Sequence, residues 1–232
     1  MPVALANVKP LLLQKSTSLI FCRLPCGVIE SHSVFRVMMT VFKPARNIVQ
    51  QHFQQAENEL KKGTLYVVAT PIGNLGDISL RALAVLKNAD HIFAEDTRVT
   101  AKLLSAYGLH RPLQSLREHN EMAMAQKIIA LFHDGKTVAQ VSDAGTPAVC
   151  DPGAKLVAAV KNAGLPVYPI SGACAAITAL SAAGIVADDF YFAGFLPAKS
   201  AERQKRLTAL SDMTYTIILY ESPHRISGCL KD

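Results

Sequence analysis

The sequence predicts an α/β fold: an open, mostly parallel sheet domain followed by a second α/β domain that is incomplete in this chain. Three observations lead to this prediction. Short apolar runs alternate with stretches of helical spacing from Gly63 to Gly184, and the connections between them are short. Hydrophobic residues are 50% of the chain and charged residues 18%, so a core can be buried. After Gly184 the alternation gives way to two apolar strands that flank a charged stretch.

Residues 1–45 are expected to form an extension that differs from the rest of the chain. Their apolar runs, at residues 11–13 and 19–21, are interrupted by charged residues and by Pro25. No run reaches the ~18 apolar residues of a membrane-spanning helix, and no clear secretory signal is present. Because Met38 and Met39 precede the next segment, we expect residues 1–38 to be dispensable.

The segment 46–62 is predicted to be one amphipathic helix, because its apolar residues recur at helical spacing and Gly63 follows as a stop signal. These apolar residues are Val49, Phe53, Ala56 and Leu60.

The first α/β domain is predicted to cover residues 63–169 and to contain four strands. The strands are expected at residues 64–70, 91–94, 137–141 and 166–170. Helices are expected at residues 79–86, 97–107, 121–133 and 151–164. Asp96 and Asn120 are the predicted N-caps of two of them, and Asp151 with Pro152 at the next position is predicted to begin the fourth.

The second domain is predicted to cover residues 170–232. A helix of small residues is expected to begin at Ser171 and Gly172 and to end at Gly184, followed by strands at residues 190–195 and 216–220. A short helix with a charged stretch, residues 199–206, is expected between the strands. Because only two clear strands are present, we expect a truncated domain.

Charge and cysteine content exclude some classes of protein. The net charge is +6, but residues 1–62 hold eight Lys and Arg against three Glu, so residues 63–232 are nearly neutral. A polyanion site in that part would have to be a local cluster. The 5 cysteines are an odd number and widely spaced, which favours reduced thiols in the cytoplasm over a disulfide scaffold.

Four predicted strands end in loops of unusual composition: PIGNLGD, EDTR, SDAGTP and PISGAC. In open α/β sheets, ligands bind at the carboxyl ends of the strands, so these loops indicate a small-ligand site. Each loop alone is also compatible with ordinary turn chemistry. Nucleotide-binding glycine loops, a G-x-S-x-G elbow and an H-E-x-x-H zinc motif are all absent from the sequence. The G-x-x-G at Gly73 follows a strand, unlike the loop of a KH domain.

Two groups of acidic residues are candidates for chemistry. Glu95 and Asp96 beside Arg98 can act on a substrate, or Asp96 can cap the following helix and pair with Arg98. Asp143 can hold a ligand, or it can order its own loop through backbone N–H groups.

Several motifs, in order along residues 63–232, resemble the small-subunit ribosomal RNA methyltransferase branch of the tetrapyrrole methylase superfamily. They are GTLYVVATPIGNLGD (63–77), AEDTR (94–98), REHN (117–120), VSDAGTPAVCDPG (141–153), GFLPAKS (194–200) and YESPHR (220–225). PIGN, EDTR and SDAGTP together make the resemblance specific.

The resemblance implies a two-domain α/β enzyme that binds S-adenosylmethionine in the cleft between its domains. The implied reaction is methylation of the ribose 2′-OH of a cytidine in small-subunit ribosomal RNA. A homodimer, cytoplasmic location, no metal and no membrane association are also expected. The residues that match the family's cofactor loops are Pro71, Gly73, Asn74, Ser142, Asp143, Ala144, Gly145, Thr146, Pro147, Pro169, Ser171, Gly172 and Ala173. Ser171 stands where the family usually has Pro.

With this resemblance, Glu95, Asp96 and Arg98 become the catalytic candidates, with one carboxylate as base and Arg98 on an RNA phosphate. The basic residues expected to contact the RNA, free or in the assembled small subunit, are Lys199, Arg203, Lys205, Arg206, His224 and Arg225. Two alternatives stay open: methylation of a small molecule such as a tetrapyrrole, and RNA binding without catalysis.

Overall fold

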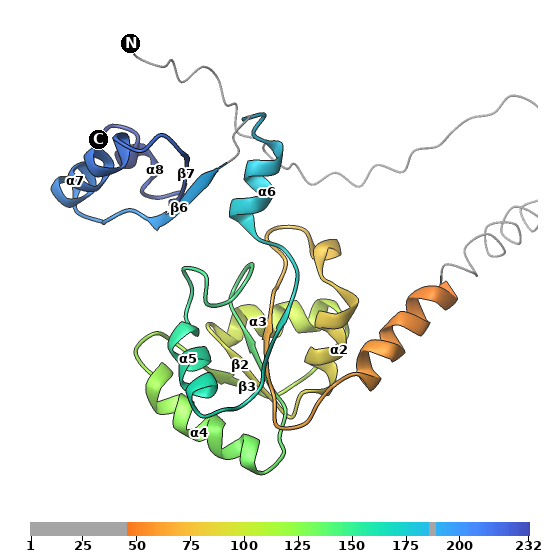
Figure 1. Ribbon diagram of the computed structural model, residues 1–232. Helices are drawn as coiled ribbons and strands as arrows, with labels where there is room; N and C mark the ends of the chain where they lie inside the picture. Colours follow the sequence, from red (N-terminus) through yellow and green to blue (C-terminus); the bar gives the residue numbers. More distant parts are fainter. Residues whose placement is uncertain (1–45, 186–188) are drawn as a thin grey trace, which may run out of the picture. The chain divides into compact units, whose positions relative to one another are not determined.

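The computed structural model describes residues 46–185 and 189–232 (Figure 1). The predictions about residues 1–45 therefore lie outside the described residues. Residues 46–58 are helical, so the helix predicted over 46–62 is present but ends at residue 58. Near its end, this helix is held to the next one: Glu57 accepts hydrogen bonds at 2.8 Å from both Lys87 Nζ and Asn88 Nδ2.

A five-stranded sheet is formed by strands between residues 65 and 170, with the strand order β3-β2-β4-β1-β5. All of its strand pairs are parallel, so the predicted open parallel sheet is confirmed. The strands are β1 (Leu65–Val68), β2 (His91–Ala94), β3 (Leu113–Ser115), β4 (Val138–Val141) and β5 (Val167–Ile170). The prediction of four strands missed β3, which lies at the edge of the sheet and is only 3 residues long.

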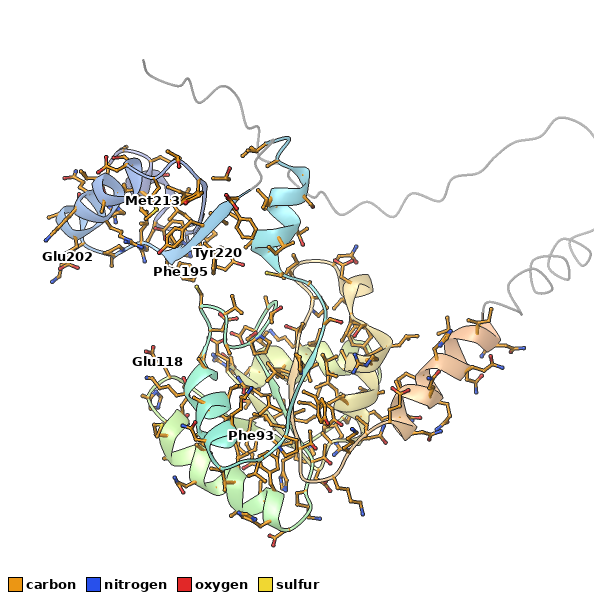
Figure 2. The ribbon with its side chains drawn as sticks, in the orientation of Figure 1. Phe93, Glu118, Phe195, Glu202, Met213 and Tyr220 are labelled. Atoms are coloured by element: carbon orange, nitrogen blue, oxygen red, sulfur yellow. The ribbon has the colours of Figure 1, made fainter. Side chains whose placement is uncertain are left out.

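Helices cover both faces of this sheet, as Figure 1 shows. They are α2 (Leu80–Asn88), α3 (Thr97–Ala106), α4 (Glu121–His133) and α5 (Ala154–Asn162). In β1, Tyr66 and Val68 pack with α2 and α3 in one buried cluster, while Leu65 and Val67 pack with α4 and α5 in another. Phe93 of β2 is fully buried in the second cluster (Figure 2). Burial on both faces explains why the strands read as continuous apolar runs.

Two of the three predicted helix N-caps occupy the N-cap position in the structure, and the third does not. Asp96 caps α3 by accepting from Arg98 N at 2.8 Å, as predicted. Asn120 occupies the N-cap position of α4, but its side chain accepts from Arg117 N instead. The prediction for α5 was wrong: its N-cap is Gly153, and residues 151–153 form a turn.

A buried carboxylate from another helix replaces the missing side-chain cap of α5. Glu121 of α4 is 3% exposed, and its Oε2 accepts from the backbone N–H groups of Lys155 (3.0 Å) and Leu156 (3.4 Å). A carboxylate at this position also complements the positive end of the helix dipole. The start of α5 is therefore fixed by a tertiary contact.

Residues 175–232 contain a separate two-stranded parallel sheet of β6 and β7. The elements are α6 (Ala175–Ala182), β6 (Phe190–Phe195), α7 (Ser200–Ser211), β7 (Thr216–Tyr220) and α8 (Ile226–Cys229). Phe192 and Phe195 meet the ring of Tyr220 edge-on at centroid distances of 4.9 and 5.6 Å, and Figure 2 shows Phe195 and Tyr220 close together. Both predicted strands are present.

None of the helices in the described part is long and apolar enough to cross a membrane. Among the same residues, no group of three or more His, Cys, Asp or Glu side chains could hold a metal ion.

Candidate functional site

The candidate site lies where the order of the strands in the sheet reverses, between β1 and β4. Strands β1 and β4 are neighbours, but the segment after β1 leads to α2 on one face and the segment after β4 leads to α5 on the other. Such a switch point opens a crevice at the carboxyl ends of the strands, where ligands of α/β proteins bind. The predicted loops at residues 69–79 and 142–153 are therefore brought together, with Glu95 after β2 and Ser171 after β5 on either side.

Backbone hydrogen bonds join the first two loops directly. Thr70 and Gly145 form an antiparallel bridge, with Thr70 N donating to Gly145 O at 2.8 Å and Gly145 N donating to Thr70 O at 3.1 Å. Gly145 has a φ of +85°, which an L side chain rarely adopts. The glycine is thus needed for the geometry of the bridge.

In the first loop, Asn74 has a structural partner. Its Oδ1 accepts from Gly76 N at 2.9 Å and caps the short 3-10 helix η1 (Leu75–Asp77). Gly73, by contrast, has a φ of +141° and open space where a side chain would be. The backbone at Gly73 can therefore be approached closely by a ligand.

The third loop, after β5, is held against the other two. Thr146 Oγ1 donates to Ala173 O at 3.1 Å. A Cβ atom on Gly172 would lie 2.8 Å from the Cβ of Ala69, which leaves no room for a side chain. Pro169 lies within β5, opposite Val67, and Ser171 is exposed. The three predicted cofactor loops form one assembly.

Three acidic residues are linked through backbone and side-chain groups. Asp143 Oδ1 accepts from Asp96 N at 3.0 Å, and Asp143 N lies 3.4 Å from Glu95 Oε2, to which it donates. Burial raises the pKa of Glu95, and the nearby carboxyl groups of Asp143, Asp151 and Asp96 add to this, whereas the bond from Asp143 N opposes it. This shift makes the Glu95 carboxylate more basic than that of an exposed glutamate.

The pKa of Asp96 is shifted in the opposite direction to that of Glu95. The guanidinium of Arg98 binds both of its oxygens, with Nε 3.0 Å from Oδ1 and Nη2 2.6 Å from Oδ2. These hydrogen bonds, together with that from Arg98 N, hold the pKa of Asp96 far below its usual range. A carboxylate this weakly basic is a poor proton acceptor, so the capping and pairing interpretation describes Asp96.

Two buried polar side chains lie where β4 leads into the second loop: Ser142, which the sequence predicted, and Gln140 of β4, which it did not. Ser142 is 2% exposed and Gln140 is 0% exposed, and within the described residues Ser142 Oγ and Gln140 Oε1 have no hydrogen-bond partner. Burial raises the pKa of Asp151. The nearby Ser142 hydroxyl lowers this pKa in part, although the two groups do not have the geometry of a hydrogen bond. Ala148 and Cys150 have left-handed φ values of 66° and 62°, a form of strain often found at functional loops.

The predicted RNA-binding residues divide into two groups. Arg203 is 7% exposed and pairs with Asp232 and two carbonyl groups, and Arg225 binds Glu221 (3.0 Å) and Leu196 O (2.7 Å). These two guanidinium groups are occupied by internal acceptors. The other predicted residues, which are Lys199, Lys205, Arg206 and His224, lie nearer the surface. Lys199 pairs with Glu202 at 3.3 Å, and Arg206 donates to Tyr191 Oη at 3.1 Å.

The parallel sheet and its switch-point loops define a class of protein: an open α/β fold with a candidate small-ligand site at the carboxyl ends of its strands. The chain belongs to the tetrapyrrole methylase family, because a match to Tetrapyrrole (Corrin/Porphyrin) Methylases covers residues 64–232. The resemblance seen in the motifs is thereby confirmed at the level of the family.

Curated relatives extend this result. The chain is 59% identical over 183 residues to a protein of Neisseria meningitidis serogroup B, and 50% identical over 184 residues to one of Escherichia coli O157:H7. Both are named Ribosomal RNA small subunit methyltransferase I, and each alignment covers 79% of this chain. The chain spans only 63% of the length of either relative.

Solved structures show the same fold at low sequence identity. A cobalt precorrin-4 methyltransferase has a TM-score of 0.54 at 19% identity, with 75% of this chain and 76% of that chain covered. A diphthine synthase has a TM-score of 0.51 at 16% identity, with 69% and 65% covered.

Proposed function

We propose that this chain is part of an S-adenosylmethionine-dependent enzyme that methylates the ribose 2′-OH of a cytidine in small-subunit ribosomal RNA. The observation that carries the proposal is the assembly of three motif-bearing loops at the switch point of the sheet. Family membership supports methyl transfer, and the names of the relatives support the ribosomal substrate. The domain boundaries predicted above, at residues 63–169 and 170–232, are part of this proposal.

The residues of the site fit this cofactor. S-adenosylmethionine supplies an electrophilic methyl group on a cationic sulfur and carries no phosphate. The site has carboxyl groups on Glu95, Asp143 and Asp151, and a buried hydroxyl on Ser142 that lacks a partner among the described residues. Such acceptors suit a cation. The open space beside Gly73 allows close approach to the backbone. The residues proposed to hold S-adenosylmethionine are the residues of the three loops that were matched to the family's cofactor loops.

Glu95 is proposed as the proton acceptor for the 2′-OH. Its raised pKa makes the carboxylate more basic than an exposed glutamate, and a positioned base contributes about two to four powers of ten in rate. Asp143 N orients the Glu95 carboxyl, and Asp96 holds Arg98 in place. The Arg98 side chain is 83% exposed and is proposed to contact an RNA phosphate.

The RNA is proposed to contact the accessible basic residues of the second domain, which are Lys199, Lys205, Arg206 and His224. The proposed partner is the small-subunit ribosomal RNA, free or assembled in the subunit, which implies a cytoplasmic location. A homodimer is also proposed, on family resemblance alone.

A methylation assay tests the proposal. Small ribosomal subunits from cells that lack the modification are incubated with the protein and S-adenosylmethionine labelled in the methyl group, and the modified nucleotide is located by mass spectrometry. Glu95→Gln should lose activity, whereas Asp134→Asn, an exposed carboxylate just before β4 at the opposite edge of the sheet, should retain it. Label on a tetrapyrrole but not on RNA would favour the small-molecule alternative. Absence of any heat on cofactor titration would favour RNA binding without catalysis.

A further inference from the structure

A cavity of about 520 Å³ lies away from the switch-point loops, in the first domain. It is lined by the end of the 46–58 helix and the residues after it, by α2, and by strands β1 and β5. No residue of the loops 69–79, 142–153 or 171–173 lines it. Its volume is typical of small-ligand sites.

The floor of the cavity is apolar and fixed. Leu60, Tyr66, Val85 and Ile170 line it, and all of them belong to or pack against one buried cluster of the sheet. The ring of Tyr168 stacks on that of Tyr66 at a centroid distance of 5.9 Å and an interplanar angle of 27°. The floor of the cavity is thus made of apolar atoms and two stacked aromatic rings.

The rim of the cavity carries two cationic groups. Lys61 Nζ donates to Tyr168 Oη at 3.2 Å and lies 5.1 Å from the centre of that ring, while Lys61 N donates to Tyr66 Oη at 2.8 Å. Lys61 is thus held at the cavity by three contacts. Arg81 also lines the cavity, and it has no ion-pair partner among residues 46–185 and 189–232.

Two further polar side chains complete the rim. Glu59 carries the opposing charge, and its Oε1 accepts from Gln55 Nε2 at 3.0 Å. Asn58 accepts from Gln54 Nε2 at 3.3 Å, which leaves its own amide N–H groups available. The rim therefore has a net charge of +1 and amide donors, above an apolar floor.

We propose that this cavity is a second ligand site, which binds a nucleoside phosphate. The base and ribose would pack on the apolar floor, with Asn58 at their polar edge, and the phosphate would lie between Lys61 and Arg81. Charge-assisted hydrogen bonds from lysine and arginine are the strong contacts for phosphate. Several lining residues, from Ala56 to Lys61, precede residue 64, where the family match begins. The site therefore goes beyond the proposed methyl transfer and does not depend on it.

Calorimetry with 5′-AMP as the probe tests this site. Arg81→Gln is expected to weaken AMP binding about tenfold, because one charge-assisted contact is lost. Lys102→Gln, an exposed cation on α3 that does not line the cavity, is the matched control and should bind AMP as the unaltered chain does. Tyr168→Phe removes only the hydroxyl that holds Lys61 Nζ and should weaken binding several-fold. Circular dichroism would check that each variant is folded.

Three further titrations identify the ligand and its source. Adenosine and inorganic phosphate should each bind more weakly than AMP, because each lacks half of the contacts. A short single-stranded oligoadenylate that binds more tightly than AMP would assign the site to RNA, and the reverse order would assign it to a free nucleotide. AMP should still bind when S-adenosylmethionine is saturating, since the two sites share no residue.

Saturable AMP binding that is lost when the cofactor is added would overturn the proposal, as would equal affinities of Arg81→Gln and Lys102→Gln. Failure to detect AMP binding up to about 5 mM would also overturn it. A chain that binds AMP but not S-adenosylmethionine would count against the proposed methyl transfer and leave this site standing.

Discussion

Gly153, at the start of α5, is the position where a single methyl group should disturb the candidate site most. A Cβ atom there would lie 1.4 Å from Gln140 Nε2 and 2.5 Å from Gln140 Cδ. Gln140 is fully buried in β4 and donates from Nε2 to Pro152 O at 3.1 Å. Gly153→Ala must therefore displace either this side chain or the end of the loop 142–153.

Gly164, after α5, provides the matched control for the size of the effect. Its φ is +72°, and no other atom lies within 4 Å of an added Cβ, so Gly164→Ala carries only the backbone cost, about 1–2 kcal/mol. Gly153 has a φ of +119°, and overpacking adds about 1–3 kcal/mol to the backbone cost. We therefore expect Gly153→Ala to lower the free energy of unfolding by about 2–5 kcal/mol in total.

Urea unfolding measures both variants, and a double-mutant cycle isolates the contact with Gln140. The coupling between Gly153→Ala and Gln140→Ala should be about 1–3 kcal/mol in the favourable direction, because the shortened side chain makes room for the methyl group. Calorimetry should show reduced cofactor affinity for Gly153→Ala and unchanged affinity for Gly164→Ala. Equal destabilisation of the two glycine variants, or no coupling in the cycle, would refute the steric argument.

Three other changes test the site and its supports. Glu95→Gln should slow methyl transfer by about two to four powers of ten. Because the pKa of Glu95 is raised in the folded state, the unaltered chain loses stability as the pH rises above the usual glutamate value of 4.5. Glu95→Gln should therefore be more stable than the unaltered chain at pH 7 and should have no advantage below pH 4.5. Urea unfolding midpoints at both pH values check this. Gly172→Ala should weaken cofactor binding in calorimetry, and adding Ala69→Gly should restore it; failure of the rescue would contradict the contact at 2.8 Å. Glu121→Ala should cost about 1–3 kcal/mol in urea unfolding, more than Glu121→Gln, which keeps an acceptor for the N–H groups of α5.

The sheet and the position of the site could be predicted because both follow from local patterns. Leu65–Val68 and Val138–Val141 are short apolar runs bounded by turn residues, as expected for buried parallel strands. Once parallel strands are predicted, the loops that follow them must meet at one edge, whatever the strand order. The strand order itself, which makes β1 and β4 neighbours, depends on contacts between distant residues.

The elements that the sequence did not predict depend on tertiary contacts. Strand β3 has the sequence Leu-Gln-Ser, without β-branched or aromatic residues, and pairing with β2 alone makes it a strand. The true start of α5 is set by Glu121, more than thirty positions away in the sequence. Likewise, Arg203 belongs to a run of basic residues in the sequence, but Asp232 pairs with it from 29 positions away.

Most of the glycines and small residues described in the motifs assemble the loops, which leaves ligand recognition to side chains and to the open backbone at Gly73. The backbone groups of Thr70 and Gly145 bind each other, and Thr146 is bound to Ala173. Groups satisfied in this way cannot also contact a ligand without breaking a bond that holds the loops together. Among the described residues at this edge, the Ser142 hydroxyl and Gln140 Oε1 have no hydrogen-bond partner, and the Glu95 carboxyl accepts only from Asp143 N. A motif built of small residues can thus be highly specific in sequence because it must fold three loops against one another. We expect the chemistry to depend on the few side chains that the loops leave unsatisfied.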